Sequence, residues 1–240
     1  MAKINEAERV TQDRVLALFR DAPALGYEYY GDLRYETNTN VMTEKLTAWL
    51  VSPKGGGHSQ TLADKAVFEL IKTAGNLQQG LYKANQEVYS LLKYGAKVKE
   101  NPGESEKTVY FVDWEHSHNN EFAVAEEVTI KSGSERRPDL VVYINGIAVA
   151  VIELKKSTVS VSQGIRQNLS NQSEHFNKPF FTTVQFVMAG NSSEGLRYGA
   201  IETQEKYYLE WKNDTVNTDA QPLDGVSLDI LERCKTLPDK

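Results

Sequence analysis

The stretch RRPDLVVYINGIAVAVIELK, residues 136–155, constrains the fold more than any other part of the chain. It contains two apolar runs rich in β-branched residues, Leu140–Ile144 and Ile147–Leu154, separated by Asn145-Gly146. An Asn-Gly pair between two such runs is typical of a tight β-hairpin. Apolar residues occupy both alternating sets of positions, so we expect both faces of the hairpin to be covered. The stretch therefore predicts a hairpin at the centre of a sheet.

Helical and strand patterns follow one another along the rest of the chain. The apolar periodicity predicts helices at 6–19, 43–50, 61–70, 77–94 and 160–176. Runs of β-branched and aromatic residues predict strands at 109–112, 122–130 and 180–188, with shorter ones near 198 and at 207–211. This order predicts an α/β fold with a central mixed sheet flanked by helices and with extra N-terminal helices.

The composition is that of a globular protein, with 40% hydrophobic and 25% charged residues among 240. No apolar stretch is long enough to cross a bilayer, and the first residues do not form an export signal. Cys234 is the single cysteine, which excludes an intramolecular disulfide and fits a cytoplasmic location. The net charge of −6 argues against a protein that finds nucleic acid by bulk electrostatics alone.

Three charged residues stand at the open end of the predicted hairpin: Asp139, Glu153 and Lys155. Charges at the end of a buried element are costly to desolvate unless they are paired or bind a metal ion. The common structural explanation is a salt bridge between Lys155 and Glu153 at a sheet edge. The functional explanation is a shared site, and it requires all three side chains to lie on one face of the sheet.

The closure of the hairpin decides which face each side chain occupies. A two-residue turn at Asn145-Gly146 pairs Asp139 with Ile152 and leaves Asp139 and Glu153 on opposite faces. A three-residue loop with Gly146 as a left-handed bulge pairs Asp139 with Val151 and puts both acids on one face, about 7 to 8 Å apart along the diagonal. We expect the three-residue loop, or an equivalent bulge within a strand.

Two carboxylates and an amine on one face suit the hydrolysis of a phosphodiester bond. The reaction needs an activated water and stabilisation of the charge that builds on the phosphate. Mg²⁺ prefers oxygen ligands and typically takes one or two carboxylates together with waters and phosphate oxygens. Asp139 and Glu153 are the predicted ligands, and Lys155 is predicted to orient the attacking water or to stabilise the transition state.

This stretch resembles the PD-(D/E)xK nuclease motif, and its surroundings resemble the N-terminal domain of the R (HsdR) subunit of type I restriction endonucleases. The resemblance extends from about Thr11 to Trp211 and so covers most of the chain. The segments that carry it are Gln12–Val15, Leu25–Tyr27, Asn76–Tyr82, Glu126–Thr129, Arg137–Asp139, Ile152–Lys155, Ser160–Leu169 and Met188–Asn191.

The resemblance implies a restriction-endonuclease-like core that cleaves double-stranded DNA with Mg²⁺, for which Mn²⁺ substitutes. It implies that Asp139, Glu153 and the backbone carbonyl of Leu154 hold the metal ion. Full R subunits also contain an ATP-driven translocase and work with modification (M) and specificity (S) subunits. We therefore expect a nuclease domain at 1–212, with a helical part at about 1–105 and a catalytic sheet core at about 106–212. Residues 213–240 are expected to link it to a motor that is absent from this sequence.

Two positions depart from the motifs of related nucleases. Gln167 matches the glutamine of a Gln-x-x-x-Tyr element and is a predicted catalytic residue, but Asn171 stands where the tyrosine is expected. Gln163, Gln167 and Asn171 recur every four residues, so they form a helix face that either meets DNA or is simply solvated. Gln12 stands where the first helix of related nucleases carries an acid, with Glu8 and Asp13 nearby.

Other features carry less information. His116 and His118 lack a third converging ligand and are expected to be loop residues. Arg136-Arg137 either steers phosphate or is a solvent-exposed pair. Gly55–Gly57 lacks the Lys-Ser/Thr ending of a phosphate loop. Two further functions stay open: a stand-alone Mg²⁺ nuclease, and a non-catalytic docking module that keeps the fold.

Overall fold

The computed structural model describes residues 6–21, 25–35, 38–130, 136–173 and 177–211. The expected linker at 213–240, with Cys234, lies outside these residues, as does the side chain of Glu8. The described helices are α1 (Glu6–Asp21), α2 (Thr43–Val51), α3 (Gln60–Ala74), α4 (Leu81–Tyr94), α5 (Val161–Ser173) and α6 (Lys178–Phe181). Short 3-10 turns cover Pro53–Gly55, Ser117–Asn119 and Glu205–Tyr207.

The strands form one large mixed sheet and one small hairpin. The sheet has seven strands in the order β1-β4-β5-β6-β7-β8-β9. In this sheet β1 pairs parallel with β4 and β6 pairs parallel with β7, while the other neighbours are antiparallel. Its strands are β1 (Glu28–Asp32), β4 (Phe122–Glu126), β5 (Leu140–Ile144), β6 (Ile147–Leu154), β7 (Phe186–Asn191), β8 (Gly195–Gly199) and β9 (Leu209–Glu210). The small hairpin joins β2 (Ala96–Val98) to β3 (Lys107–Val109).

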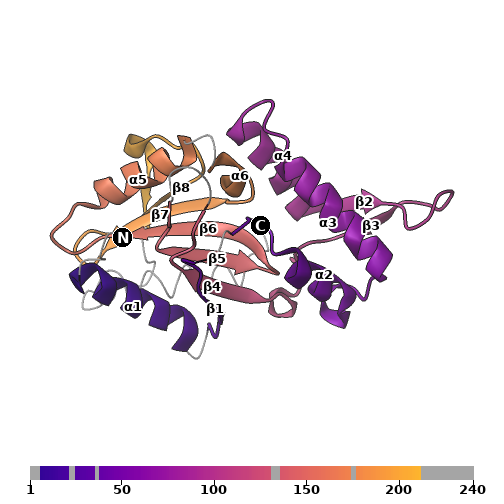
Figure 1. Cartoon of the computed structure of the whole chain (residues 1–240), viewed down its shortest axis with the longest axis horizontal. Helices are drawn as coiled ribbons and strands as arrows, with labels where there is room; N and C mark the ends of the chain where they lie inside the picture. The colour runs from indigo at the N-terminus through magenta and orange to yellow at the C-terminus, as the bar shows by residue number, and fades with distance from the viewer. Residues whose placement is uncertain (1–5, 22–24, 36–37, 131–135, 174–176, 212–240) are drawn as a thin grey trace.

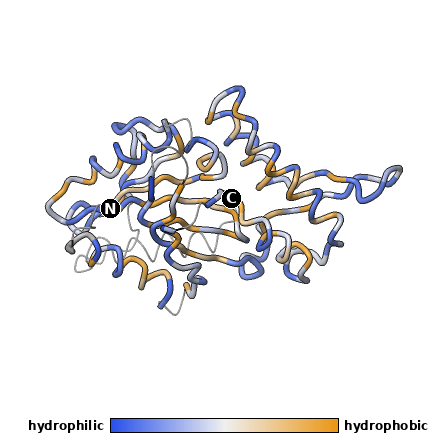
Figure 2. The backbone as a smooth tube through the Cα atoms, in the orientation of Figure 1, coloured by the Kyte–Doolittle hydropathy of each residue, from blue (hydrophilic) through white to orange (hydrophobic). Residues whose placement is uncertain are grey.

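Helices cover both faces of the sheet, as Figure 1 shows. On one face α1 packs through Val15, Leu16 and Phe19 against side chains of β4 to β8. On the other face lie α5 and α6, whose buried residues include Ile165 and Phe181. Helices α2, α3 and α4 form a further core with β2 and β3 at one end of the sheet. Figure 2 shows hydrophobic residues along the central strands and hydrophilic ones in the β2–β3 loop.

The hairpin β5–β6 is central, as expected, but its turn is not the predicted three-residue loop. Ile144 pairs directly with Ile147, so Asn145 and Gly146 form a two-residue turn. Both have positive φ, 52° and 82°, which is the conformation of a type I′ turn. The turn is packed tightly, since a Cβ on Gly146 would lie 3.0 Å from the Met42 carbonyl oxygen.

A bulge within β6 then changes the register. Tyr143 pairs with Ala148 but Val142 pairs with Ala150, so Val149 has no opposite residue. The predicted alternative of a bulge inside a strand is therefore confirmed. Contacts from distant parts of the chain hold the backbone there: Ala148 N donates to the Asn40 carbonyl at 2.9 Å, and Gln185 N donates to the Val149 carbonyl at 2.8 Å.

Several predicted element boundaries were wrong. The strand expected at 180–188 begins only at Phe186, because a proline in the first turn of α6 starts a short helix at Lys178. The strand expected at 122–130 ends at Glu126, because Glu127 has a φ of 52° and cannot continue it. Strands β1 and β2 were not predicted, since neither has a clear alternation of polar and apolar residues.

Candidate active site

Extended by one residue, the register of β5 and β6 places Asp139, which lies in the bend just before β5, opposite Glu153. Leu140 pairs with Ile152, so the residue before β5 meets the residue after Ile152. Side chains directly opposite each other in an antiparallel pair have Cβ atoms about 5 Å apart. The carboxylate of Asp139 also accepts a hydrogen bond from Leu154 N at 2.6 Å, which anchors it to the end of β6. The two acids thus share one face and stand directly opposite rather than on the predicted diagonal.

Lys155 and Glu153 lie on the same side of the sheet, beneath α5. A Cβ built on Gly164 of α5 would be 3.6 Å from both Glu153 Cβ and Lys155 Cγ. It would also lie 3.0 Å from Ala189 Cβ, which is a tight contact, so the absence of a side chain at Gly164 helps α5 to pack closely on the strands. The three predicted residues Asp139, Glu153 and Lys155 are therefore brought together at one end of the hairpin.

The carboxylate of Glu153 is fully buried, with 0% of the residue exposed. Asn171 on α5, itself 1% exposed, donates from Nδ2 to Glu153 Oε1 at 3.3 Å. The asparagine at the position expected to hold tyrosine thus contacts the site. The sequence signal for it was its spacing from Gln167, but the spacing alone gave no partner.

The two glutamines that share the predicted helix face with Asn171, Gln163 and Gln167, do not contact this site through hydrogen bonds among the described residues. Gln167 is half-buried, and no hydrogen bond of its side chain occurs among the residues that the structure describes. Gln163 is exposed. The face on which these residues recur therefore divides into a buried end at Asn171 and a solvated end at Gln163.

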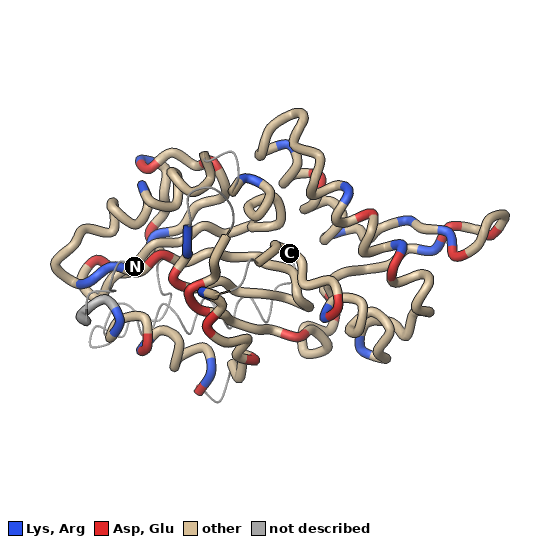
Figure 3. Tube along the Cα trace, in the orientation of Figure 1, with Lys and Arg blue, Asp and Glu red and all other residues tan. Residues whose placement is uncertain are grey.

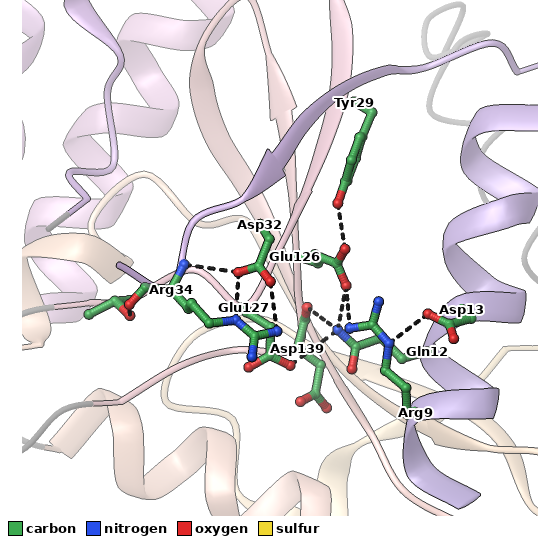
Figure 4. Close-up of polar contacts among 10 residues, drawn as sticks. Arg9, Gln12, Asp13, Tyr29, Asp32, Arg34, Glu126, Glu127 and Asp139 are labelled. Carbon is green, nitrogen blue, oxygen red and sulfur yellow. Dashed lines mark hydrogen bonds and ion pairs between the residues drawn. The ribbon is translucent and has the colours of Figure 1, made fainter. Parts of the chain in front are cut away.

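A second group of polar residues lies on the α1 side of the same strand ends (Figure 4). Sequence reasoning had noted Gln12 at the position of the first-helix acid and Glu126–Thr129 within the resemblance, but it assigned neither a role in the site. Gln12 Nε2 lies 3.2 Å from Glu126 Oε2, 3.2 Å from Glu127 Oε1 and 3.3 Å from the Asp139 carbonyl oxygen. Arg9 Nη1 lies 2.7 Å from Glu126 Oε2. Figure 3 shows the acidic positions gathered where the central strands end near α1. The available signal was the pair of adjacent acids, Glu126 and Glu127, at the end of an apolar strand.

The buried acid Glu126 changes the ionisation of its neighbours. Burial, together with the hydrogen bond from its hydroxyl group to Glu126, raises the pKa of Tyr29 to about 12. Burial alone would lower the pKa of Arg9, but the hydrogen bond and charge of Glu126 outweigh it and the pKa is raised. Both groups therefore keep their protons and serve as donors to Glu126.

The remaining candidates do not form sites. The rings of His116 and His118 are 6.0 Å apart, and in the described ranges no three His, Cys, Asp or Glu side chains are grouped to hold a metal ion. A cation at Asp139 and Glu153 must therefore complete its ligands with backbone, water or substrate oxygens. Arg136 and Arg137 are half-buried. Among the described helices, none is long and apolar enough to span a membrane.

The chain is similar to endonuclease subunits of type I restriction enzymes. It is 30% identical over 158 residues to the "Type I restriction enzyme HindI endonuclease subunit" of Haemophilus influenzae. The aligned residues make up 63% of this chain and 15% of that relative. It is 26% identical over 172 residues to the "Putative type I restriction enzyme MjaIXP endonuclease subunit" of Methanocaldococcus jannaschii. Here the aligned residues make up 68% of this chain and 16% of the relative. The chain thus spans about one sixth of the length of these relatives.

A family comparison covers nearly the whole described region. The family described as "Type I restriction enzyme R protein N terminus" matches residues 3–206. The mixed seven-stranded sheet flanked by helices is consistent with a restriction-endonuclease-like fold, so the predicted fold class is confirmed. The chain belongs to the family of N-terminal domains of type I restriction enzyme R proteins.

Proposed function

We propose that this chain carries the nuclease site of a type I restriction enzyme R subunit and hydrolyses phosphodiester bonds of double-stranded DNA with Mg²⁺. The observation that carries the proposal is the register that puts Asp139 opposite Glu153, with Lys155 on the same side beneath α5. Membership of the family supports the restriction role. Mn²⁺ is expected to substitute for Mg²⁺.

The donors at this end of the hairpin fit a hard divalent cation. Asp139 and Glu153 offer carboxylate oxygens, and a fully buried carboxylate such as Glu153 favours a nearby positive charge. The N–H of Leu154 points toward Asp139, and the N–H and C=O of one strand residue point to the same side of the strand. The carbonyl oxygen of Leu154 is therefore directed to the same place and is the proposed third protein ligand.

Each residue has a separate role in the proposed reaction. Mg²⁺, when bound, supplies Lewis-acid stabilisation of the phosphate and lowers the pKa of a water. Asp139 is held in place by Leu154 N, and Glu153 is oriented by Asn171. Lys155 places an ammonium group beside them, where it orients the attacking water and stabilises charge on the scissile phosphate. Gln167, half-buried on α5, is proposed to contact the DNA next to the scissile bond.

We further propose that the rest of a longer R subunit delivers the DNA. The chain has a net charge of −6, which does not favour autonomous binding to phosphates. An ATP-driven motor outside this sequence and the M and S subunits would hold the duplex and bring it to the site. ATP is therefore expected to act on that motor and not on the residues described here.

The proposal is tested first by metal binding. Calorimetric titration of Mn²⁺ is expected to show binding to the wild type and its loss in Asp139→Ala and Glu153→Ala. The matched control is Glu205→Ala, which removes a carboxylate that pairs with Arg166 on the exposed side of α5. Equal Mn²⁺ binding by the wild type and Asp139→Ala would refute the metal site.

Cleavage assays then separate the three functions. Metal-dependent nicking of a plasmid by this chain alone would favour a stand-alone nuclease. Cleavage that needs the motor, the M and S subunits and ATP would favour the restriction role. If a complex that carries Glu153→Ala still cuts DNA, the chain acts as a docking module rather than as the nuclease. Loss of cutting in Lys155→Ala, with normal Mn²⁺ binding, would support the role proposed for the Lys155 amine.

A further inference from the structure

Gln12 is a polar residue at a core position of α1. It shares a helix face with Val15, Leu16 and Phe19, which pack on the sheet, and only 1% of it is exposed. A buried amide without partners is strongly destabilising. Its contacts should therefore explain why this position is polar.

The side-chain amide of Gln12 reaches three acceptors at the ends of two strands. They are the carboxylates of Glu126 and Glu127 and the backbone carbonyl of Asp139, all 3.2 to 3.3 Å from Nε2. The NH₂ group has two hydrogens, so the three acceptors share them. Glu126 also has Arg9 and Tyr29 as donors. The contacts to Glu127 and to Asp139 therefore depend more on Gln12.

These contacts bear directly on the main chain of Asp139. Its carbonyl accepts from Glu127 N at 3.0 Å as well as from Gln12, while its carboxylate accepts from Leu154 N. Glu127 has a φ of 52°, an unfavourable conformation for a non-glycine residue that must be held by its surroundings. The amide of Gln12 thus ties α1 to the junction that sets where the Asp139 carboxylate lies relative to Glu153.

We propose that Gln12 is a positioning residue: its amide fixes Asp139 at the metal site by bridging Glu127 and the Asp139 backbone. This inference rests on the proposed function, in which Asp139 is a metal ligand. The role needs a hydrogen-bond donor. A carboxylate of the same shape accepts only, and it would face the negative charges of Glu126 and Glu127.

The test uses Mn²⁺ affinity and stability measured on the same variants. Gln12→Met removes the donor without adding charge, and Gln12→Glu adds a repelling carboxylate. We expect Mn²⁺ to bind about 10-fold more weakly to Gln12→Met, the usual scale for a residue that orients a metal ligand, and more weakly still to Gln12→Glu. The double variant Gln12→Glu/Glu127→Gln restores a hydrogen bond between positions 12 and 127 but leaves the Asp139 carbonyl without this donor, so it is expected to recover only part of the affinity lost in Gln12→Glu.

A matched control separates positioning from a general loss of stability. Asn85 on α4 is also a buried amide that reaches three acceptors, the carbonyls of Phe181, Thr182 and Val184, away from the strand ends that carry Asp139. Asn85→Asp is expected to lower the melting temperature and leave Mn²⁺ affinity unchanged.

The outcomes distinguish this inference from the proposed function. Wild-type affinity in both single variants would overturn the positioning role while leaving the metal site intact. Tighter Mn²⁺ binding by Gln12→Glu would also overturn it, because position 12 would then supply a ligand. A wild type that binds no Mn²⁺ would overturn the proposed metal site and this inference together.

Discussion

Replacing Asn145 with alanine is expected to destabilise the protein severely, because this side chain holds the turn between β5 and β6. Asn145 is 0% exposed. Its Nδ2 donates to the Phe111 carbonyl and to Asn120 Oδ1, both at 2.9 Å, and its Oδ1 accepts from Glu121 N at 2.7 Å. Alanine removes all three hydrogen bonds.

The magnitude follows from two separate terms. Three buried hydrogen bonds at about 1 kcal/mol each give about 3 kcal/mol. Asn145 has a φ of 52°, and alanine in this left-handed region costs about 1 kcal/mol more than glycine. We therefore expect Asn145→Ala to lose about 4 kcal/mol and Asn145→Gly about 3 kcal/mol of unfolding free energy.

Urea unfolding followed by circular dichroism measures both values. The control is Asn101→Ala, which removes a hydrogen bond to Glu104 from an exposed loop and is expected to change stability by less than about 0.5 kcal/mol. A loss below about 1 kcal/mol in Asn145→Ala, or a glycine variant less stable than the alanine variant, would refute the reasoning.

Three further predictions concern the strand ends. Arg9→Met removes the cation that pairs with the buried carboxylate of Glu126 and is expected to lower the unfolding free energy by about 2 kcal/mol. The loss is smaller than for a fully buried pair because Arg9 is partly exposed, and unchanged urea unfolding would contradict it. Burial and Glu126 raise the pKa of Tyr29 from 10.0 to about 12. The contribution of the protonated Tyr29 hydroxyl to folding stability is therefore complete below pH 10 and is lost as pH rises through about 12. The difference in phenolate absorbance between wild type and Tyr29→Phe should show that pKa, and a midpoint near 10 would argue against it. Asn171→Leu removes a donor from the buried carboxylate of Glu153 and should cost about 2 kcal/mol in thermal or urea unfolding, whereas a gain in stability would show that the hydrogen bond is unimportant.

Local sequence patterns predicted the elements around the site with good accuracy. The apolar periodicity placed α1, α2 and α5 within a few residues of their observed ends. At the start of α5, Ser160 Oγ accepts a hydrogen bond from Ser162 N at 3.3 Å. These features depend on residues close together in the chain. The same is true of Asn145-Gly146, whose chemistry alone is enough to favour a tight turn.

The partners of the site residues were beyond the reach of such patterns. Gln12 meets Glu126 and Glu127 across more than a hundred residues, and Asn171 meets Glu153 only because α5 packs on β6. A glutamine or asparagine on a helix has no periodic signal that separates a buried donor from a solvated side chain. Their contacts become visible only when the sheet and the helices are assembled.

The sequence by itself determined that a central hairpin would carry Asp139, Glu153 and Lys155 at its open end, since apolar alternation and turn chemistry are local. It did not determine on which face each side chain would lie. The bulge at Val149 decided this, and contacts from Asn40 and Gln185 hold its backbone. Because one extra residue in a strand moves every following side chain to the other face, the arrangement of the acids depends on packing far from them in the chain.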